Sequence, residues 1–395
     1  MKIKKESLQT IFLQGLTSLN SFILVLTIQH YYGLIELGRY SVFLTFSLLI
    51  CSIHMSKYIS PVLALKKEMI SNKGIIFYYF KKLFLIYFFS LISITFVFVN
   101  IIDKQIISFL LFSIVYIFLD FNKKTLIIFD KYFFLILLEM LFISLILFFF
   151  YFDIFSLSTL IIKLIITYTL ILILTLLLLL KIYNQFSYLI NSKINQKILF
   201  NLCDDGKSMF KINIIQLSIS NFIMLTSVYF VSLTEFGLIR LVQNFTNIVN
   251  PLSNYIDLFL KPKMSREKIS LDKFNFYINK LNLFLIPFLM LLSIIILYYL
   301  YSIKIELIFK NILTILTCLS ISYLVVINSL FRSYLQVIRF SKNIFNAYKY
   351  ALLTTCFVFL PFVYFFKGNG MLLTLLLVQF TILISMKINK NERIY

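Results

Sequence analysis

Long apolar stretches separated by short polar ones recur along the whole chain, and most have the length of a membrane-spanning helix. An α-helix needs about 20 mostly apolar residues to cross a hydrocarbon core about 30 Å thick. Because the stretches lack the period-two alternation of a membrane barrel, helices are the backbone form that satisfies its own hydrogen bonds in lipid. The pattern predicts an all-α polytopic membrane helical bundle with about 12 transmembrane helices. The predicted segments are 8–32, 38–62, 83–99, 105–121, 132–152, 157–180, 208–232, 236–260, 281–300, 306–331, 347–366 and 369–386.

The composition supports this class of protein. Hydrophobic residues make up 61% of the 395 residues and charged residues only 13%, a balance that a soluble protein of this length could not bury. The first apolar run follows Met-Lys-Ile-Lys-Lys, which could suggest a secretory signal. Since that run is as long as a full span and no small-x-small cleavage site follows it, we interpret it as the first retained helix.

The basic residues alternate between loops and so predict an orientation. Of the 37 lysines and arginines, 30 lie in every second connection or at the two ends of the chain. The positive-inside rule therefore places both termini and these basic loops in the cytoplasm, which requires an even number of crossings. The net charge of +21 then reflects loops beside anionic headgroups, and nucleic acid is not an expected partner.

The sequence offers no pattern for enzyme chemistry. The four cysteines and two histidines have no short metal-ligand spacing, and no His/Asp/Ser grouping or glycine-rich phosphate loop is present. We therefore predict no enzymatic activity, no catalytic or metal site and no cofactor.

The two halves of the chain resemble each other where each begins. In the first half, a tight outer turn at Glu36-Leu37-Gly38 precedes a helix that carries Pro61; in the second, Glu235-Phe236-Gly237 precedes a helix that carries Pro251. We predict two six-helix lobes, residues 1–197 and 198–395, around a central cavity. Because six is even, the lobes would be related by an axis along the membrane normal, a layout typical of transporters.

The chain length, the six-plus-six arrangement and two short motifs resemble the Wzx-type O-antigen and polysaccharide flippases. The motifs are Glu36-Leu37-Gly38-Arg39-Tyr40 and the stretch from Glu235 through Pro251 to Lys261-Pro262. These flippases belong to the multidrug/oligosaccharidyl-lipid/polysaccharide exporter superfamily, which also holds the multidrug antiporters and the peptidoglycan-precursor flippases. The fourteen-helix layout of the last group does not fit this shorter chain.

The resemblance implies a role in O-antigen or related lipopolysaccharide biosynthesis. The protein would move an undecaprenyl-pyrophosphate-linked oligosaccharide from the cytoplasmic to the outer leaflet of a bacterial inner membrane by alternating access. Its other implied partners are membrane lipids, a polysaccharide polymerase and a chain-length regulator. Coupling to protons or sodium ions is left open.

The eighth predicted segment suits such a substrate best. Polar residues recur there at spacings of three and four, which places them on one helical face. They are Arg240, Gln243, Asn244, Asn247, Asn250, Asn254 and Asp257. Pro251 is expected to bend this helix and to leave the carbonyl of Asn247 without an amide partner. The face would line a hydrated cavity, or its amides would only hold helices together, each contributing about 1 kcal/mol.

Charged residues inside the predicted spans leave two further questions open. Lys163, Arg240 and Lys310 lie about one turn inside the outer end of their helices, where each could extend to the interface or help to receive a pyrophosphate. Glu139 lies about two turns deep in the fifth segment, where it would pair with a cation or carry a coupling ion.

Two other functions compete with flipping. A multidrug antiporter of the same superfamily would bind organic cations, but the charges within the predicted spans are mainly cationic. A membrane-embedded polysaccharide polymerase would need a catalytic constellation, usually on a sizeable outer loop, and the outer loops predicted here are short.

Overall fold

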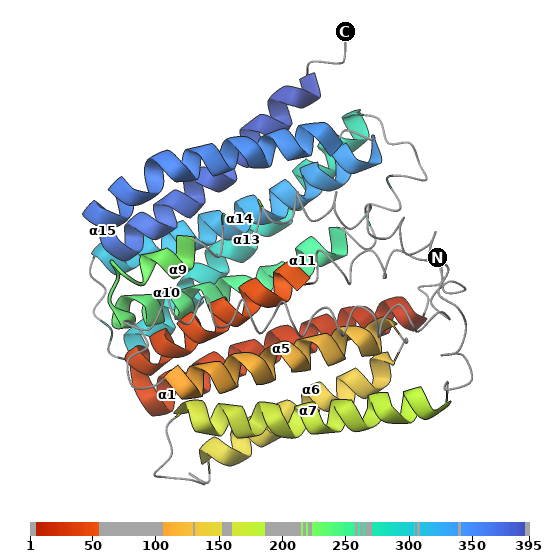
Figure 1. The fold of residues 1–395 in the computed structure, drawn as a ribbon. Helices are drawn as coiled ribbons and strands as arrows, with labels where there is room; N and C mark the ends of the chain where they lie inside the picture. The colour runs from red at the N-terminus through yellow and green to blue at the C-terminus, as the bar shows by residue number, and fades with distance from the viewer. Residues whose placement is uncertain are drawn as a thin grey trace. The chain divides into compact units, whose positions relative to one another are not determined.

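The computed structural model describes most of the predicted helices and omits several connections. The described residues are 5–54, 106–128, 131–151, 160–185, 215, 219, 223–256, 260, 264, 271–303, 305, 309–338 and 341–391. Regular secondary structure within these ranges is entirely helical (Figure 1). The predicted segment 83–99, most of 208–232 and parts of several other predicted segments lie outside them, as do Pro61 and Lys261-Pro262.

The chain divides into two compact units that do not follow its linear halves. Unit 1 comprises Met1–Leu16 and Arg39–Asn221, and unit 2 comprises Thr17–Gly38 and Phe222–Tyr395. The predicted lobe boundary at 197/198 lies outside the described residues, so the division into two six-helix lobes stays a prediction.

Helix α1 (Lys5–His54) contains the first predicted span and the described part of the second, and belongs partly to each unit. Its only non-helical residue is Gly33, with φ 78° and ψ −175°, a conformation that suits glycine because it has no Cβ. The predicted turn at Glu36-Leu37-Gly38 is therefore wrong. The chain turns at Gly33, and the motif lies within the helix that follows.

In the described part of unit 1, α1 is followed by α5 (Ile106–Ile128), α6 (Tyr132–Tyr151) and α7 (Leu160–Gln185), which pack on one another. Their interior is aromatic. The ring of Phe112 lies edge-on to that of Tyr168 with centroids 5.6 Å apart, and Tyr168 lies 5.0 Å from Phe142. Helix α5 extends seven residues past the predicted end at 121, so Lys123 and Lys124 are helical residues and not loop residues.

Unit 2 contains the second-half helices. They are α9 (Ile223–Ser227), α10 (Leu233–Thr246), the short 3-10 helix η5 (Asn247–Val249), α11 (Asn250–Tyr255), α13 (Leu271–Ser302), α14 (Phe309–Val337) and α15 (Ser341–Asn391). Ser232 caps α10, because its hydroxyl accepts a hydrogen bond from the amide of Glu235 at 3.2 Å. The predicted turn at Glu235-Phe236-Gly237 is thus also wrong, since this motif forms the first turn of α10.

The last two predicted spans, 347–366 and 369–386, appear as one element, α15. Their junction is Lys367, a non-glycine residue with a positive φ of 49°. Helix α13 starts ten residues before the predicted 281, because polar residues such as Asp272 and Lys280 end the hydropathy signal but continue the helix.

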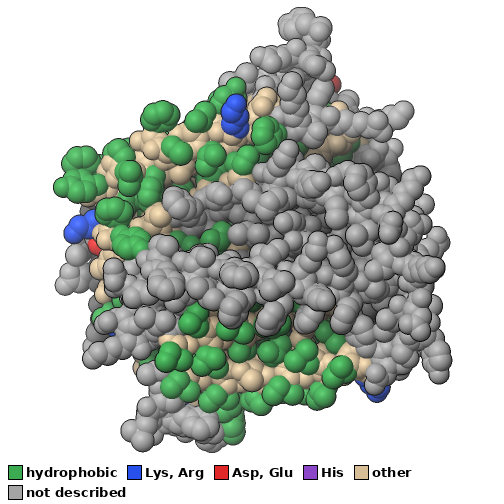
Figure 2. Space-filling view, in the orientation of Figure 1, with side chains coloured by type: hydrophobic (Ala, Val, Ile, Leu, Met, Phe, Trp, Pro, Cys, Tyr) green, Lys and Arg blue, Asp and Glu red, His purple; other side chains and the backbone are tan. Residues whose placement is uncertain are grey.

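Six helical stretches in the described ranges are long and apolar enough to cross a membrane. They are Phe12–Leu49, Tyr132–Tyr151, Leu160–Lys181, Asp272–Ser302, Asn311–Val337 and Asn343–Lys387. Hydrophobic side chains cover much of the face drawn in colour in Figure 2, and lysine and arginine lie near its margins. The prediction of an all-α, multi-pass membrane protein is confirmed.

Candidate functional site

The polar face of the eighth predicted segment falls on three consecutive short helices of unit 2. Asn244 is buried, with 3% of its surface exposed. Arg240, Gln243 and Asn247 are half-buried, and Asn250 is exposed. Asp257 and the side chain of Asn254 lie outside the described set. The face therefore passes from the interior at Asn244 to an accessible surface at Asn250.

Asn244 joins α10 to the first half of α1. Its side-chain amide donates to the backbone carbonyls of Ser21 and Phe22, each at 3.4 Å, and its side-chain oxygen accepts from the Ser21 hydroxyl at 3.3 Å. The rings of Phe22 and Phe245 pack edge-on beside this contact, 5.0 Å between centroids. For Asn244, the structure thus shows an amide that holds two helices together.

Pro251 interrupts the helix as expected, but the carbonyl of Asn247 is not left free. The segment divides into α10, η5 and α11, and the amide of Asn250 donates to the Asn247 carbonyl in a 3-10 turn. Because the tighter i→i+3 turn supplies a donor one residue earlier than an α-helix would, the predicted free acceptor is wrong.

Helix α13 contacts the first half of α1 through a second polar bridge. The Tyr299 hydroxyl donates to Gln29 Oε1 at 2.7 Å, and the Tyr299 ring lies 5.2 Å from that of Phe245. Ser21, Gln29 and Asn244 are therefore parts of one polar and aromatic seam along residues 17–38 of unit 2. The sequence pattern did not identify Gln29 or Tyr299, because single polar residues near helix ends carry no spacing signal.

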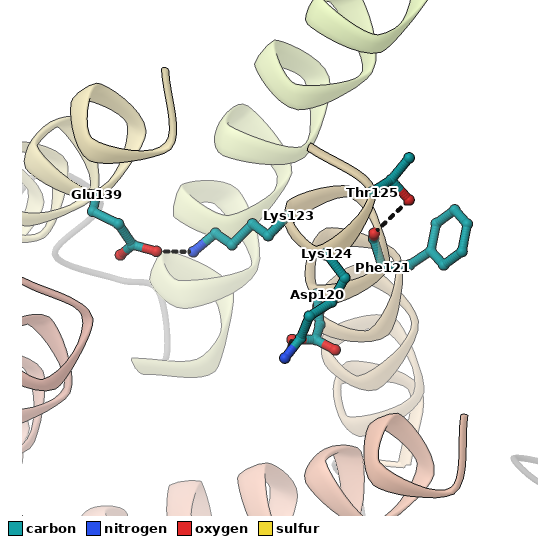
Figure 3. Close-up of polar contacts among 6 residues, drawn as sticks. All are labelled: Asp120, Phe121, Lys123, Lys124, Thr125 and Glu139. Carbon is teal, nitrogen blue, oxygen red and sulfur yellow. Dashed lines mark hydrogen bonds and ion pairs between the residues drawn. The ribbon is translucent and has the colours of Figure 1, made fainter. Parts of the chain in front are cut away.

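In unit 1, Glu139 forms an ion pair (Figure 3). Its Oε1 atom lies 2.6 Å from Lys123 Nζ, and the two side chains point toward each other from α6 and α5. The carboxylate side chain is 4% exposed and the lysine side chain 22%. Lys123 Nζ also lies 5.8 Å from the centroid of the Phe142 ring. The pairing that the sequence left open is present.

The partner of Glu139 was not identified from the sequence, although a signal exists. Lys123 and Glu139 lie eight residues on either side of Lys131, in the connection between α5 and α6. Two antiparallel helices joined by a short turn place such positions at similar depth. Because the apolar run ends at residue 121, hydropathy alone predicts that Lys123 lies in a loop.

The structure describes the side chain of one of the two other predicted cationic site residues, Lys163, but not that of Lys310. Lys163 on α7 is buried, with 1% exposure, and its Nζ lies 5.8 Å from the ring centroid of Phe150. The ammonium group therefore does not reach the protein surface in this conformation. Lys310 is a residue of α14 whose side chain lies outside the described set. Substrate roles for both stay predictions.

Comparison with known proteins gives a likeness in structure alone. No protein-family model matches the sequence, and no curated protein matches it. The fold is similar to that of the lipid II flippase MurJ in an inward closed conformation, with a TM-score of 0.65 and 15% identity, over 98% of this chain and 87% of that one. A crystal structure of MATE in complex with MaD3S matches at a TM-score of 0.47 and 12% identity, over 97% and 93% of the two chains, which is too distant to carry an argument.

Proposed function

We propose that this protein is a flippase that moves undecaprenyl-pyrophosphate-linked oligosaccharide, an O-antigen or related repeat unit, from the cytoplasmic to the outer leaflet of a bacterial inner membrane. The observation that carries the proposal is the likeness in fold to a lipid II flippase over 98% of this chain. At 15% identity that likeness concerns the fold, so the substrate must be argued from the residues.

The α10–η5–α11 segment supplies suitable groups for such a substrate. Gln243, Asn247 and Asn250 provide amides that can bond to sugar hydroxyls, and Arg240 can bind a pyrophosphate through two parallel hydrogen bonds. Polar groups at membrane depth are costly unless they meet water or partners, and Asn250 is exposed. Lys163 and Lys310 would add positive charge if a change of conformation brought them to the substrate.

Glu139 is the residue we propose for ion coupling. A proton or sodium ion that reached the carboxylate would take the place of Lys123, whose side chain is 22% exposed and therefore already borders the surface. Glu139→Gln should then abolish transport while the protein accumulates normally. Wild-type transport by the Gln variant would leave the Lys123 pair as a structural contact.

Complementation of a strain that lacks its own repeat-unit flippase tests the main proposal. Expression of this chain should restore polysaccharide display, and Asn247→Leu should reduce it because an apolar side chain removes a hydrogen-bonding group. Export of a fluorescent organic cation, measured in the same cells, would instead favour a multidrug antiporter. Failure to restore display in hosts with several different repeat units would contradict the proposal.

A further inference from the structure

Two glycines of unit 2, one from each half of the chain, meet in a reciprocal backbone contact. A Cβ built on Gly38 would overlap the carbonyl oxygen of Leu233, and a Cβ built on Gly237 would overlap the carbonyl oxygen of Leu34. Leu34 precedes Gly38 by four residues, just as Leu233 precedes Gly237. The Glu-x-Gly motifs that repeat in the two halves therefore pack against each other in the manner of a local two-fold axis.

This contact is tight but weak. Glycine allows two helix backbones to approach with no side chain between them, and each glycine Cα hydrogen faces the carbonyl of the opposite helix. Contacts of the Cα–H···O type are individually weak. Such an interface leaves no gap between the helices when they are in contact, and little free energy is needed to separate them.

The helix that carries Gly38 continues without interruption into unit 1. Gly33 is the only non-helical residue of α1, so residues 34–54 form one helix. Its first turn, through Gly38, clusters with unit 2, whereas Arg39 and the residues after it cluster with unit 1. A movement of residues 39–54 must then bend an intact helix at 38/39 or separate the glycine contact. Separation is the easier change.

The residues before Gly33 are held differently. Ser21 and Phe22 bond to Asn244, and Gln29 accepts a hydrogen bond from Tyr299. The chain between this held segment and the glycine contact contains Gly33, whose positive φ marks a break in the helix. Gly33 is thus placed to act as a hinge between a fixed segment and a movable one.

We propose that Gly38 and Gly237 form a latch that is closed in this structure and separates during transport, with residues 34–54 turning about Gly33. This proposal rests on the proposed transport function for its purpose. The repeated Glu-x-Gly motifs then form a reversible backbone contact. The contact lies at the helix ends that the positive-inside rule predicts to face away from the cytoplasm.

The first experiment measures opening without measuring transport. The four native cysteines are replaced by serine, and Leu37→Cys, at a position that is fully buried beside Gly38, reports access to an impermeant thiol reagent added to either face of the membrane. Gly38→Ala and Gly237→Ala each prevent close approach, so labelling from the outer face should accelerate about tenfold. Gly15→Ala is the matched control, because a Cβ at Gly15 meets no atom within 4 Å.

Unchanged labelling in both latch variants, with size-exclusion profiles like that of the parent protein, would overturn the proposal. This result does not depend on the substrate, so it is distinguishable from failure of the flippase assignment.

The second experiment locks the latch. Leu34→Cys and Leu233→Cys are joined by a short reducible bifunctional thiol reagent in cells that depend on this chain for polysaccharide display. Display should stop on cross-linking and return after reduction, whereas Leu34→Cys alone should be unaffected by the reagent. Continued display by fully cross-linked protein would show that residues 34 and 233 stay together throughout the cycle, which contradicts a latch.

Discussion

Two neighbouring lysines of α5 have very different surroundings. Lys123 pairs with a carboxylate that is 4% exposed on another helix. Lys124 Nζ lies 3.6 Å from Oδ1 of Asp120 on the same helix (Figure 3). The Lys124 side chain is 30% exposed and the Asp120 side chain 24%. A charge that is buried without its counter-ion is costly, whereas an exposed pair four residues apart on a helix contributes little.

The two lysines therefore predict opposite outcomes for the same substitution. Lys123→Gln should destabilise the protein by about 3 kcal/mol, the lower end of the range for breaking a buried pair, because Lys123 is partly exposed. Lys124→Gln should change stability by less than about 0.5 kcal/mol. Thermal unfolding in one detergent gives the comparison. The double variant Lys123→Gln/Glu139→Gln should recover much of the loss, and additive losses would contradict a direct pair.

Variants at Arg240 distinguish a role in substrate binding from a position at the membrane interface without such a role. If its guanidinium binds a pyrophosphate, Arg240→Lys should retain partial polysaccharide display, since lysine keeps the charge but loses the bidentate geometry. Arg240→Gln should reduce display at least about tenfold, because hydrogen bonds to charged groups are worth roughly 1.5–3 kcal/mol. If the side chain only extends to the interface, the Gln variant would match the parent at equal protein levels, and a binding role would be untenable.

At the level of elements, Pro251 sets the shape of the polar segment. It lies in the first turn of α11, directly after the 3-10 turn Asn247–Val249, so the polar segment is not one regular α-helix. Asn244 is buried before the 3-10 turn and Asn250 is exposed after it, so one segment serves both helix packing and a polar surface.

Pro251→Ala is expected to turn the 3-10 turn before it into regular α-helix, because alanine supplies the amide donor that proline lacks. Proline is well tolerated in the first turn of a helix, where Pro251 lies in α11, so the variant should keep about the stability of the parent. Display should nevertheless fall, because Asn247 and Asn250 would be reoriented. Thermal unfolding and display are measured on the same preparations. A loss of stability together with a loss of display would indicate that the proline has a packing role instead.

The element level also shows how far hydropathy can predict this fold. The predicted segment 132–152 agrees with α6 (Tyr132–Tyr151) to within a residue. The last two predicted segments end at 366 and begin at 369, and the break at Lys367 lies between them. Burial in lipid requires apolar residues along a whole helix, so hydropathy registers where a helix crosses. It does not register a helix that continues past the apolar run, so the end predicted at residue 121 leaves Lys123 outside the helix that contains it.

Contacts between helices are the part of the site that could not be predicted from the sequence. The polar spacing on the eighth segment identified Asn244, but its partner Ser21 lies 223 residues earlier in the chain. Glycine is common in turns, and a turn is predicted at each Glu-x-Gly motif, whereas in the structure these glycines allow close helix approach. The choice between these two uses of glycine depends on what lies opposite it.

For the whole molecule, the predicted topology can be tested directly. The alternation of basic loops places residues 57–82, 181–207 and 261–280 in the cytoplasm. In a background without native cysteines, single cysteines at Ser71 and Asn195 should resist an impermeant thiol reagent added to intact spheroplasts, while cysteines at Asp103 and Asp153 should react. Permeabilised cells supply the control for reactivity. Labelling in the reverse pattern would invert the orientation.

The membership of residues 17–38 in unit 2 has a consequence for biosynthesis. The contacts of this segment join positions 222 to 270 residues apart, so its first-made helix cannot reach its final packing until α13 has been synthesised. Contacts between distant positions form slowly because long loops must close first. During most of translation, residues 17–38 of the nascent chain therefore lack their packing partners on α10 and α13. We expect fragments released near residue 197 to be degraded rapidly in cells and to persist when residues 198–395 are co-expressed, and equal half-lives would show that the seam is dispensable for folding.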